Sequence, residues 1–198
     1  KLDAWLNSGR IDLIASIPYL PSLMTQADLS TPSLEGTVCL VVKDHRRHDF
    51  STLAALQNLP QVTVGVDYDT DTAKREFQKF FPGVNIKTLR IENFHDFFTQ
   101  KVHGIDAIVT IAEAGTAWTL LYPGYSVVIP KPNIRKAPMG YAVAKRNREL
   151  VEFLNDWVRA KKGDGSFERI YNYWVLGKGA IKTEPRWSFI RNVLKWVD

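Results

Sequence analysis

The stretch GRIDLIASIPY, residues 9–19, decides how the rest of the chain is interpreted. It follows a short predicted helix, residues 2–7, and Gly9 is suited to end that helix because glycine adopts a positive φ without strain. Residues 11–15 are apolar enough to predict a buried strand. A proline ends this strand, so residues 16–20 are expected to form a loop at its carboxyl end, where open α/β sheets bind ligands.

The same order of elements occurs again in residues 94–113. A predicted helix at 94–100 is followed by Gly104, a strand at 105–110 and a loop at 111–113. Two copies of helix, glycine, Ile-Asp strand and exposed loop suggest two similar lobes whose loops face each other. Strands and helices alternate between the two copies, which predicts a parallel, doubly wound sheet.

The size and composition are those of a globular protein. A chain of 198 residues can bury a core as one domain or as two small ones. No apolar run approaches the roughly 20 residues needed to span a bilayer. The first residues lack the apolar core of a signal peptide, so the protein is cytoplasmic or the sequence begins downstream of an export signal. The single cysteine, Cys39, excludes an internal disulfide and is expected to be a small core residue.

The formal net charge of +5 does not predict a nucleic-acid partner. The whole excess lies in residues 135–198, which carry 14 basic and 7 acidic residues. Acidic residues interrupt the basic ones at helical spacings there. This pattern is typical of a solvated helical face rather than of a surface that follows a phosphate backbone.

The motifs that usually mark an enzyme or a cofactor site do not occur in the sequence. It contains no Gly-x-Ser-x-Gly, no Walker loop, no Gly-x-Gly-x-x-Gly and no zinc-ligand spacing. His45 and His48 are neighbours in a charged linker and are not expected to bind a metal. These observations favour a binding protein without cofactor or metal over an enzyme.

Candidate binding residues lie in loops that follow predicted strands. Residues 69–73 enter a predicted helix, capped by Thr70 or Asp71, so free N–H groups and hydroxyls there could hold an anion. Capping alone explains these residue types equally well, and the carboxylates of Asp69 and Asp71 would repel an anion. The loops after the two Ile-Asp strands offer further side chains, each of which could instead be structural: Ser16, Tyr19, Glu113 and Trp118.

Seven segments, taken in order, follow one family pattern: residues 6–16, 29–32, 64–66, 70–73, 104–109, 149–155 and 164–167. They resemble the type 2 periplasmic solute-binding proteins, in particular the amino-acid-binding branch that corresponds to the bacterial extracellular solute-binding family 3. The resemblance runs through nearly the whole chain. Residues 173–178 and 185–188 are more particularly similar to substrate-binding domains fused behind dicarboxylate/amino-acid:cation symporters.

The resemblance implies an α/β, two-lobed type 2 fold, a venus flytrap that closes about two crossover strands. Lobe one is expected to comprise residues 1–43 and 135–198, and lobe two residues 44–134. The chain starts where the family has completed a strand, a helix and another strand, so lobe one is expected to lack these elements. The residues expected to line the cleft are Ser16, Pro18 and Tyr19 on one wall, Thr70, Asp71 and Thr72 on the other, and Glu113 as the partner of a cationic group.

Three departures from the family pattern argue against an ordinary α-amino acid as the ligand. Relatives that bind amino acids clamp the α-carboxylate with an arginine, and Leu23 stands at that position. They bind the α-amino group with an aspartate, and Ile111 stands there. Asp69 replaces the glycine of the anion-binding loop in lobe two.

The expected function is therefore extracytoplasmic binding of a small polar solute, without catalysis, for delivery to a membrane transporter, a symporter or a sensor. The solute could be amino-acid-like or a dicarboxylate, and the location periplasmic, with a tether to the inner membrane in the fused case. Two alternatives stay open. One is a dehydratase-like enzyme in the same cleft, with Glu113 or Asp69 as its acid or base. The other is a degenerate interaction module that binds no ligand.

Overall fold

The chain forms two compact units. The computed structural model describes residues 2–19, 27–66, 69–132 and 134–179. Unit 1 comprises Lys1–Glu35 and Ala137–Asp198, and unit 2 comprises Gly36–Lys136. The predicted lobes divided the chain at 43/44 and 134/135 instead. The difference arises because most of strand β3 (Leu34–Lys43) pairs with two strands of unit 2.

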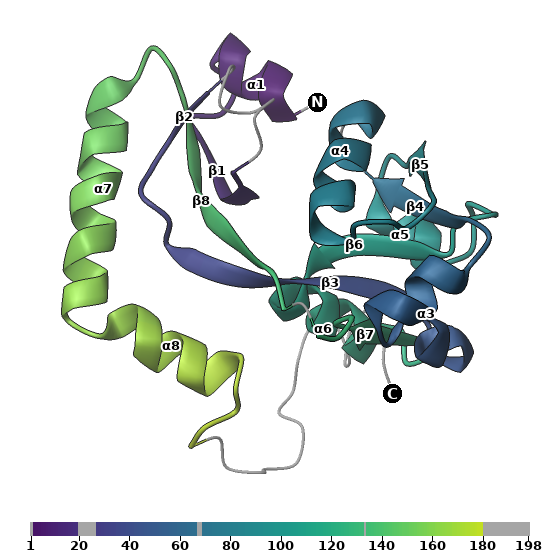
Figure 1. Cartoon of the computed structure of the whole chain (residues 1–198). Helices are drawn as coiled ribbons and strands as arrows, with labels where there is room; N and C mark the ends of the chain where they lie inside the picture. Colours follow the sequence, from purple (N-terminus) through teal and green to yellow (C-terminus); the bar gives the residue numbers. More distant parts are fainter. Residues whose placement is uncertain (1, 20–26, 67–68, 133, 180–198) are drawn as a thin grey trace, which may run out of the picture. The chain divides into compact units, whose positions relative to one another are not determined.

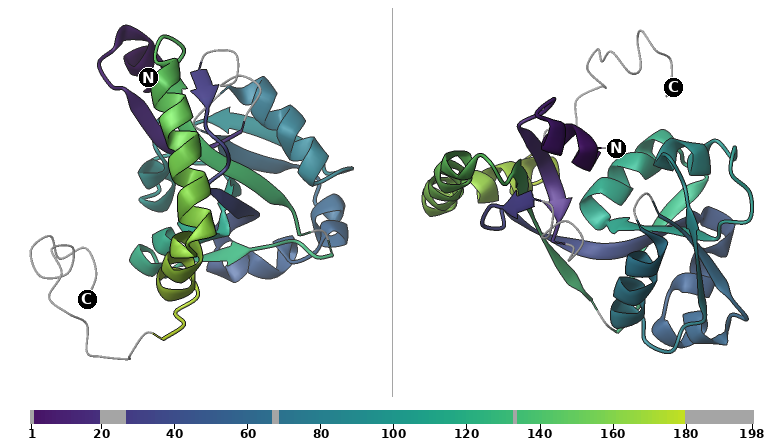
Figure 2. Two further views of the ribbon diagram at one scale, coloured as in Figure 1. Left: turned by 90° about the vertical axis from the view of Figure 1, so that its left-hand side faces the viewer. Right: turned by 90° about the horizontal axis from the view of Figure 1, so that it is seen from above.

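Unit 1 is built on strand β8 (Lys136–Ala144), which pairs antiparallel with β1 (Leu13–Pro18) and β2 (Ala27–Leu29) (Figure 1). Side chains alternate between the two faces of a strand. Ala142 and Ala144 pack with Leu6 of helix α1 (Leu2–Ser8) on one face. Val143 packs on the other face against helix α7 (Arg148–Gly163), which lies along this sheet and continues into α8 (Ser166–Trp174) (Figure 2).

The first strand differs from its prediction. It was expected to be buried and to cover residues 11–15, but β1 begins at Leu13, continues to Pro18 and contains no buried residue. Within the described residues β1 pairs with β8 alone and is therefore an edge strand, so its side chains stay accessible. Residues 16–18, predicted as a loop, therefore belong to the strand. The glycine that ends α1 is confirmed, because Gly9 has φ +77°.

Unit 2 contains a five-stranded sheet in the order β7-β3-β6-β4-β5. β4 (Val62–Val66) pairs in parallel with β5 (Ile86–Arg90) and with β6 (Ala107–Ile111), as predicted. β3 runs antiparallel to β6 and to β7 (Tyr125–Val128), which corrects the prediction of an entirely parallel sheet. The helices of this unit are the 3-10 helix η1 (Asp44–Phe50), α3 (Leu53–Asn58), α4 (Thr70–Phe80), α5 (Phe94–Phe98) and α6 (Ala112–Leu121).

Side chains pack against both faces of the unit 2 sheet. On one face Ala73 and Phe77 of α4 lie against Val64 and Val66. On the other face Cys39, Val41 and Ile108 form a core with aromatic rings that follow β5 and α6. Cys39 is fully buried, which confirms its prediction as a core residue. Trp118 belongs to this core as well, since it stacks on Phe98 with ring centroids 5.0 Å apart.

The second Ile-Asp pair has a structural role. Asp106 precedes β6 rather than lying within it, and its carboxylate accepts the Thr63 N–H (2.8 Å) and pairs with Arg46. It therefore fixes the start of β4 to the segment before β6. Across the described ranges, no helix is both long and apolar enough to cross a bilayer.

Candidate functional site

Two candidate residues of unit 1 lie at an irregularity in β1. Ala15 and Ser16 together oppose one residue of β8, because Ile14 pairs with Ala142 and Ile17 with Gly140. Ser16 is exposed and has φ +54°, the left-handed region that residues other than glycine rarely adopt. Beyond this bulge Pro18 is half-buried and lies opposite Met139. The bulge thus turns a polar side chain outward just before the strand ends.

Tyr19 is positioned by the backbone of β8. Its N–H donates to Pro138 O (3.1 Å), and its ring lies over Gly140, where a Cβ would come within 2.9 Å of Cε1. The hydroxyl is buried and has no hydrogen-bond partner within the described residues. Ser30 Oγ lies close to it but donates to Thr31 O and accepts from the Tyr141 N–H. Burial raises the pKa of Tyr19, and the nearby Ser30 hydroxyl partly offsets this effect.

The candidate residues of unit 2 lie at the N-terminus of α4, and the cap differs from its prediction. Asp69, rather than Thr70 or Asp71, is the N-cap: its carboxylate accepts the Thr72 N–H (2.7 Å), and its carbonyl accepts the Ala73 N–H (2.9 Å). The hydrogen bonds from Thr72 hold the pKa of Asp69 below its usual value. The amides of Thr70 and Asp71 make no hydrogen bond to other described residues.

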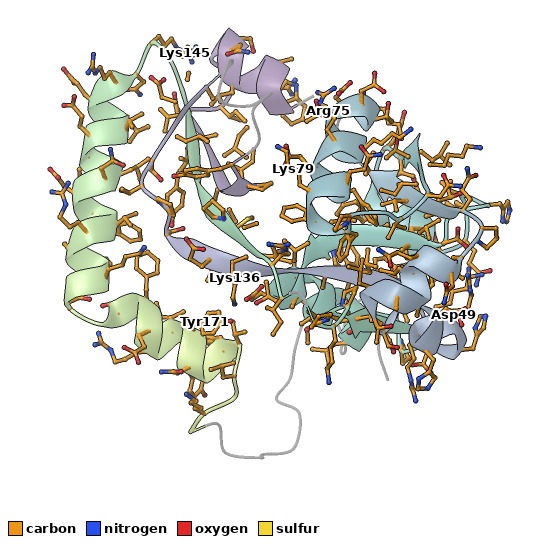
Figure 3. All side chains as sticks on the ribbon, viewed as in Figure 1. Asp49, Arg75, Lys79, Lys136, Lys145 and Tyr171 are labelled. Carbon is orange, nitrogen blue, oxygen red and sulfur yellow. The ribbon has the colours of Figure 1, made fainter. Side chains whose placement is uncertain are left out.

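Thr72 is buried, and its hydroxyl is already hydrogen-bonded within the protein. It is 7% exposed, and its hydroxyl accepts from Arg75 Nη2 (2.9 Å); Arg75 is labelled on α4 in Figure 3. Asp71 is exposed and Thr70 is half-buried. The surface that this helix end presents therefore combines two amide donors with the Asp71 carboxylate beside the Asp69 cap.

Glu113 lies in the first turn of α6 and is bound to β3. Its Oε2 accepts the Thr37 N–H (3.2 Å). Burial, followed by the nearby Glu113 carboxylate, raises the pKa of Cys39 to about 12. Glu113 is half-buried, and its carboxylate is partly committed to holding β3.

Ile111 closes β6 with an apolar side chain. Its Cγ2 lies 2.6 Å from the position that a Cβ on Gly36 would occupy, so the two residues are in close contact. No carboxylate is therefore present where the family pattern places the partner of an α-amino group. Leu23, which stands where amino-acid-binding relatives have the arginine for the α-carboxylate, lies outside the described residues.

The structure groups the predicted residues by unit. Ser16, Pro18 and Tyr19 lie together at the end of β1 in unit 1, and Thr70–Thr72 follow β4 in unit 2. Glu113 follows β6, also in unit 2. The sequence did not predict the contacts of Gly140 with Tyr19 or of Arg75 with Thr72. The spacing of Thr72 and Arg75 on one helix face could have indicated the second contact. In the part of the chain that the structure describes, no three His, Cys, Asp or Glu residues are arranged to hold a metal ion.

Comparison with known proteins identifies relatives along most of the chain. A family model described as bacterial extracellular solute-binding proteins, family 3, matches residues 1–177. The ABC transporter arginine-binding protein 1 of Escherichia coli (strain K12) is 24% identical over 166 residues. That match covers 82% of this chain but 65% of the relative, so the chain spans just under two thirds of that protein's length.

Solved structures agree with the fold. An ancestral arginine-binding protein bound to glutamine is 26% identical, with a TM-score of 0.63 over 88% of this chain and 75% of that one. The ancestral amino acid-binding protein AncCDT-1, a precursor of cyclohexadienyl dehydratase, is 24% identical, with a TM-score of 0.62 over 87% and 72%. The fold is the α/β, two-lobed type 2 fold of periplasmic binding proteins. The chain belongs to the bacterial extracellular solute-binding proteins, family 3.

Proposed function

We propose that this chain binds a small polar solute outside the cytoplasm and delivers it to a membrane transporter. The observation that carries this proposal is the position of the candidate residues within each unit. They lie at or just beyond the carboxyl ends of β1, β4 and β6, the edge at which α/β sheets bind ligands. The family match over residues 1–177 supports the same function.

The proposed ligand carries a cationic group and is not recognised as an ordinary α-amino acid. Two relatives are arginine-binding proteins by name, which supports a ligand of that charge. In this chain Asp71 and Glu113 supply carboxylates, whereas Ile111 removes the usual partner of an α-amino group. Two acidic residues at the N-terminus of α4 also disfavour a dicarboxylate, because like charges repel at short range.

Calorimetry and thermal unfolding with arginine, glutamine, polyamines and dicarboxylates test this proposal. A ligand at a hundred times its Kd stabilises the folded protein by about 2.7 kcal/mol. We expect this stabilisation for cationic solutes, with polyamines at least as effective as arginine because the α-amino acid group is not recognised, and we expect its loss in Asp71→Asn. Asp156→Asn on α7 is the matched control, because that carboxylate is 75% exposed and lies in the other unit. Unchanged unfolding with every solute would contradict the proposal and favour a module without a ligand.

We propose a membrane transporter as the partner of this protein. We also propose that the protein is not an enzyme. The relative from Escherichia coli is an ABC transporter protein by name, which supports a transporter as the recipient. Glu113, the strongest candidate for an acid or base, is bound to a backbone amide of β3. We therefore expect any solute that binds to be recovered unchanged after prolonged incubation, as followed by NMR. Turnover that Glu113→Gln abolishes would establish the enzymatic alternative.

A further inference from the structure

A groove lies between strand β2 and the first half of helix α7, entirely within unit 1. Its volume of about 610 Å³ is in the range of sites that hold a ligand. α7 contributes Arg148, Glu152 and Asn155, whose spacing places them on one stripe of the helix. β2 contributes Asp28 and Leu29. None of these residues belongs to the candidate solute site described above.

β2 turns one backbone edge toward this groove. Within the described residues β2 pairs with β8 alone, and the pairing continues past Leu29, because the Ser30 N–H donates to Tyr141 O (2.9 Å). Successive residues of an antiparallel pair direct their N–H and C=O groups alternately toward the partner strand and away from it. Leu29 and Thr31 therefore direct theirs away from β8. The side chain of Leu29 packs with Leu6, so Leu29 lines the groove with its backbone.

Asn155 shows where this edge points and bounds the groove at one end. Its Oδ1 accepts both the Thr31 N–H (2.6 Å) and the Thr31 hydroxyl (2.9 Å). One outward N–H of the edge is thus bonded to α7. Two residues earlier, the Leu29 N–H makes no such bond to another element within the described ranges. An open strand edge of this kind is a template for pairing with a further chain.

Charges of both signs line the groove. Lys145 lies at the end where β8 leads into α7, as Figure 3 shows, and Arg148 follows it in the first turn of the helix. Asp28 and Glu152 supply carboxylates further along. Arg148 Nε lies 3.6 Å from Glu152 Oε1, and both side chains are largely exposed, so this pair is weak and either group can take another partner.

We propose that this groove binds an extended peptide segment of a partner protein, which adds to β2 as a further strand. Arg148 and Asn155 are seven residues apart on α7, a rise of about 10.5 Å, and three residues of a strand rise about 10 Å. The groove therefore takes about three residues of the peptide. Main-chain hydrogen bonds to Leu29 hold its backbone.

The charges of the groove select the peptide. An acidic side chain lies at Lys145 and Arg148, and a basic side chain lies at Asp28 and Glu152. The two peptide residues are two positions apart, because only alternate side chains of a strand share a face. This proposal goes beyond the proposed function, since it concerns a protein partner and a surface that the solute does not use.

Fluorescence anisotropy with the whole chain tests the charge recognition. The probe is the labelled, end-capped hexapeptide Thr-Val-Asp-Val-Lys-Val, and the comparison peptide has lysine in place of aspartate. We expect Lys145→Glu to weaken binding of the probe about two- to tenfold and to strengthen binding of the comparison peptide. Arg159→Glu is the matched control, because Arg159 is also on α7, is 76% exposed and does not line the groove. It should leave the preference of the wild type unchanged.

Amide hydrogen exchange tests the strand addition. At about 90% occupancy by the probe the Leu29 N–H should exchange about tenfold more slowly, because only the free protein exchanges. The Thr31 N–H, already bonded to Asn155, should be unaffected. This measurement uses the wild type, so it decides the outcome even if Lys145→Glu does not fold.

A probe that is N-methylated at its aspartate and at the following valine separates a strand from a small charged solute. It keeps both charges but loses main-chain donors in either register, and we expect it to bind at least about tenfold more weakly. Equal binding of the methylated peptide would show that the groove recognises charges alone. That result, an unprotected Leu29 N–H in the complex, or no binding of the probe at millimolar concentration would each overturn the proposal.

Discussion

Gly140→Ala is expected to displace Tyr19 and to lower the free energy of unfolding by about 1–3 kcal/mol, the usual cost of inserting a methyl group into a packed site. The new Cβ would lie 2.9 Å from Tyr19 Cε1, 3.0 Å from its hydroxyl and 3.2 Å from Ser30 Oγ. All three distances are shorter than an ordinary contact. Tyr19 cannot withdraw as a whole, because its N–H is bonded to Pro138 O and Pro18 pairs with Met139.

Urea unfolding of the whole chain measures this cost. Gly163→Ala in the same unit is the matched control, because nothing lies within 4 Å of its added Cβ and the residue ends a helix. That control should be neutral or slightly stabilising. In a Tyr19→Ala background the steric cost of Gly140→Ala should fall to the small part caused by Ser30 Oγ, which identifies the ring as its main source. A loss below about 0.5 kcal/mol in the Gly140→Ala single variant, within the range of ordinary surface substitutions, would refute the reasoning.

Three further predictions concern other residues. The pKa of Asp69 is lowered in the folded protein, so the stability that its carboxylate contributes is present above the ordinary carboxyl pKa and is lost as the pH falls below about 4. Acid unfolding of wild type compared with Asp69→Asn, in which this pH dependence is absent, checks the prediction. Leu154→Ala should cost about 2–5 kcal/mol in urea unfolding because the side chain is 8% exposed, whereas Trp174→Ala, at 78% exposure, should cost less than about 1 kcal/mol. Cys39 has its pKa raised to about 12 and should react with a thiol reagent at pH 8 only after unfolding; rapid reaction of the native protein would show that β3 opens.

Residue types and capping signals predicted most helices and strands, but they did not predict which elements pair with or pack against each other. Gly9 marked the end of α1 because only its own conformation matters there. The burial of β1, in contrast, depends on strands from distant parts of the sequence. Its apolar residues predicted a buried strand, and the pairing within the described residues leaves it at an edge. Hydrophobic composition alone cannot distinguish these two environments.

The candidate residues were chosen from predicted strand ends, and the structure changes the local elements around them. Residues 16–18 belong to β1, and residues 111–113, predicted as a loop, end β6 and begin α6. The cap of α4 is Asp69 rather than one of its neighbours. Asp, Thr and Asp in sequence are all good N-caps, so the residue types could not select one. Gly140 gave no sequence signal because its importance comes from Tyr19, which lies far from it in the chain.

The division of the chain has a consequence for synthesis on the ribosome. Unit 2 is one uninterrupted segment and is complete once Lys136 has left the exit tunnel. Unit 1 cannot form at that moment, because β1 and β2 both pair with β8, which emerges last of the three. β1 and β2 therefore acquire their partner only after the whole of unit 2 has been synthesised.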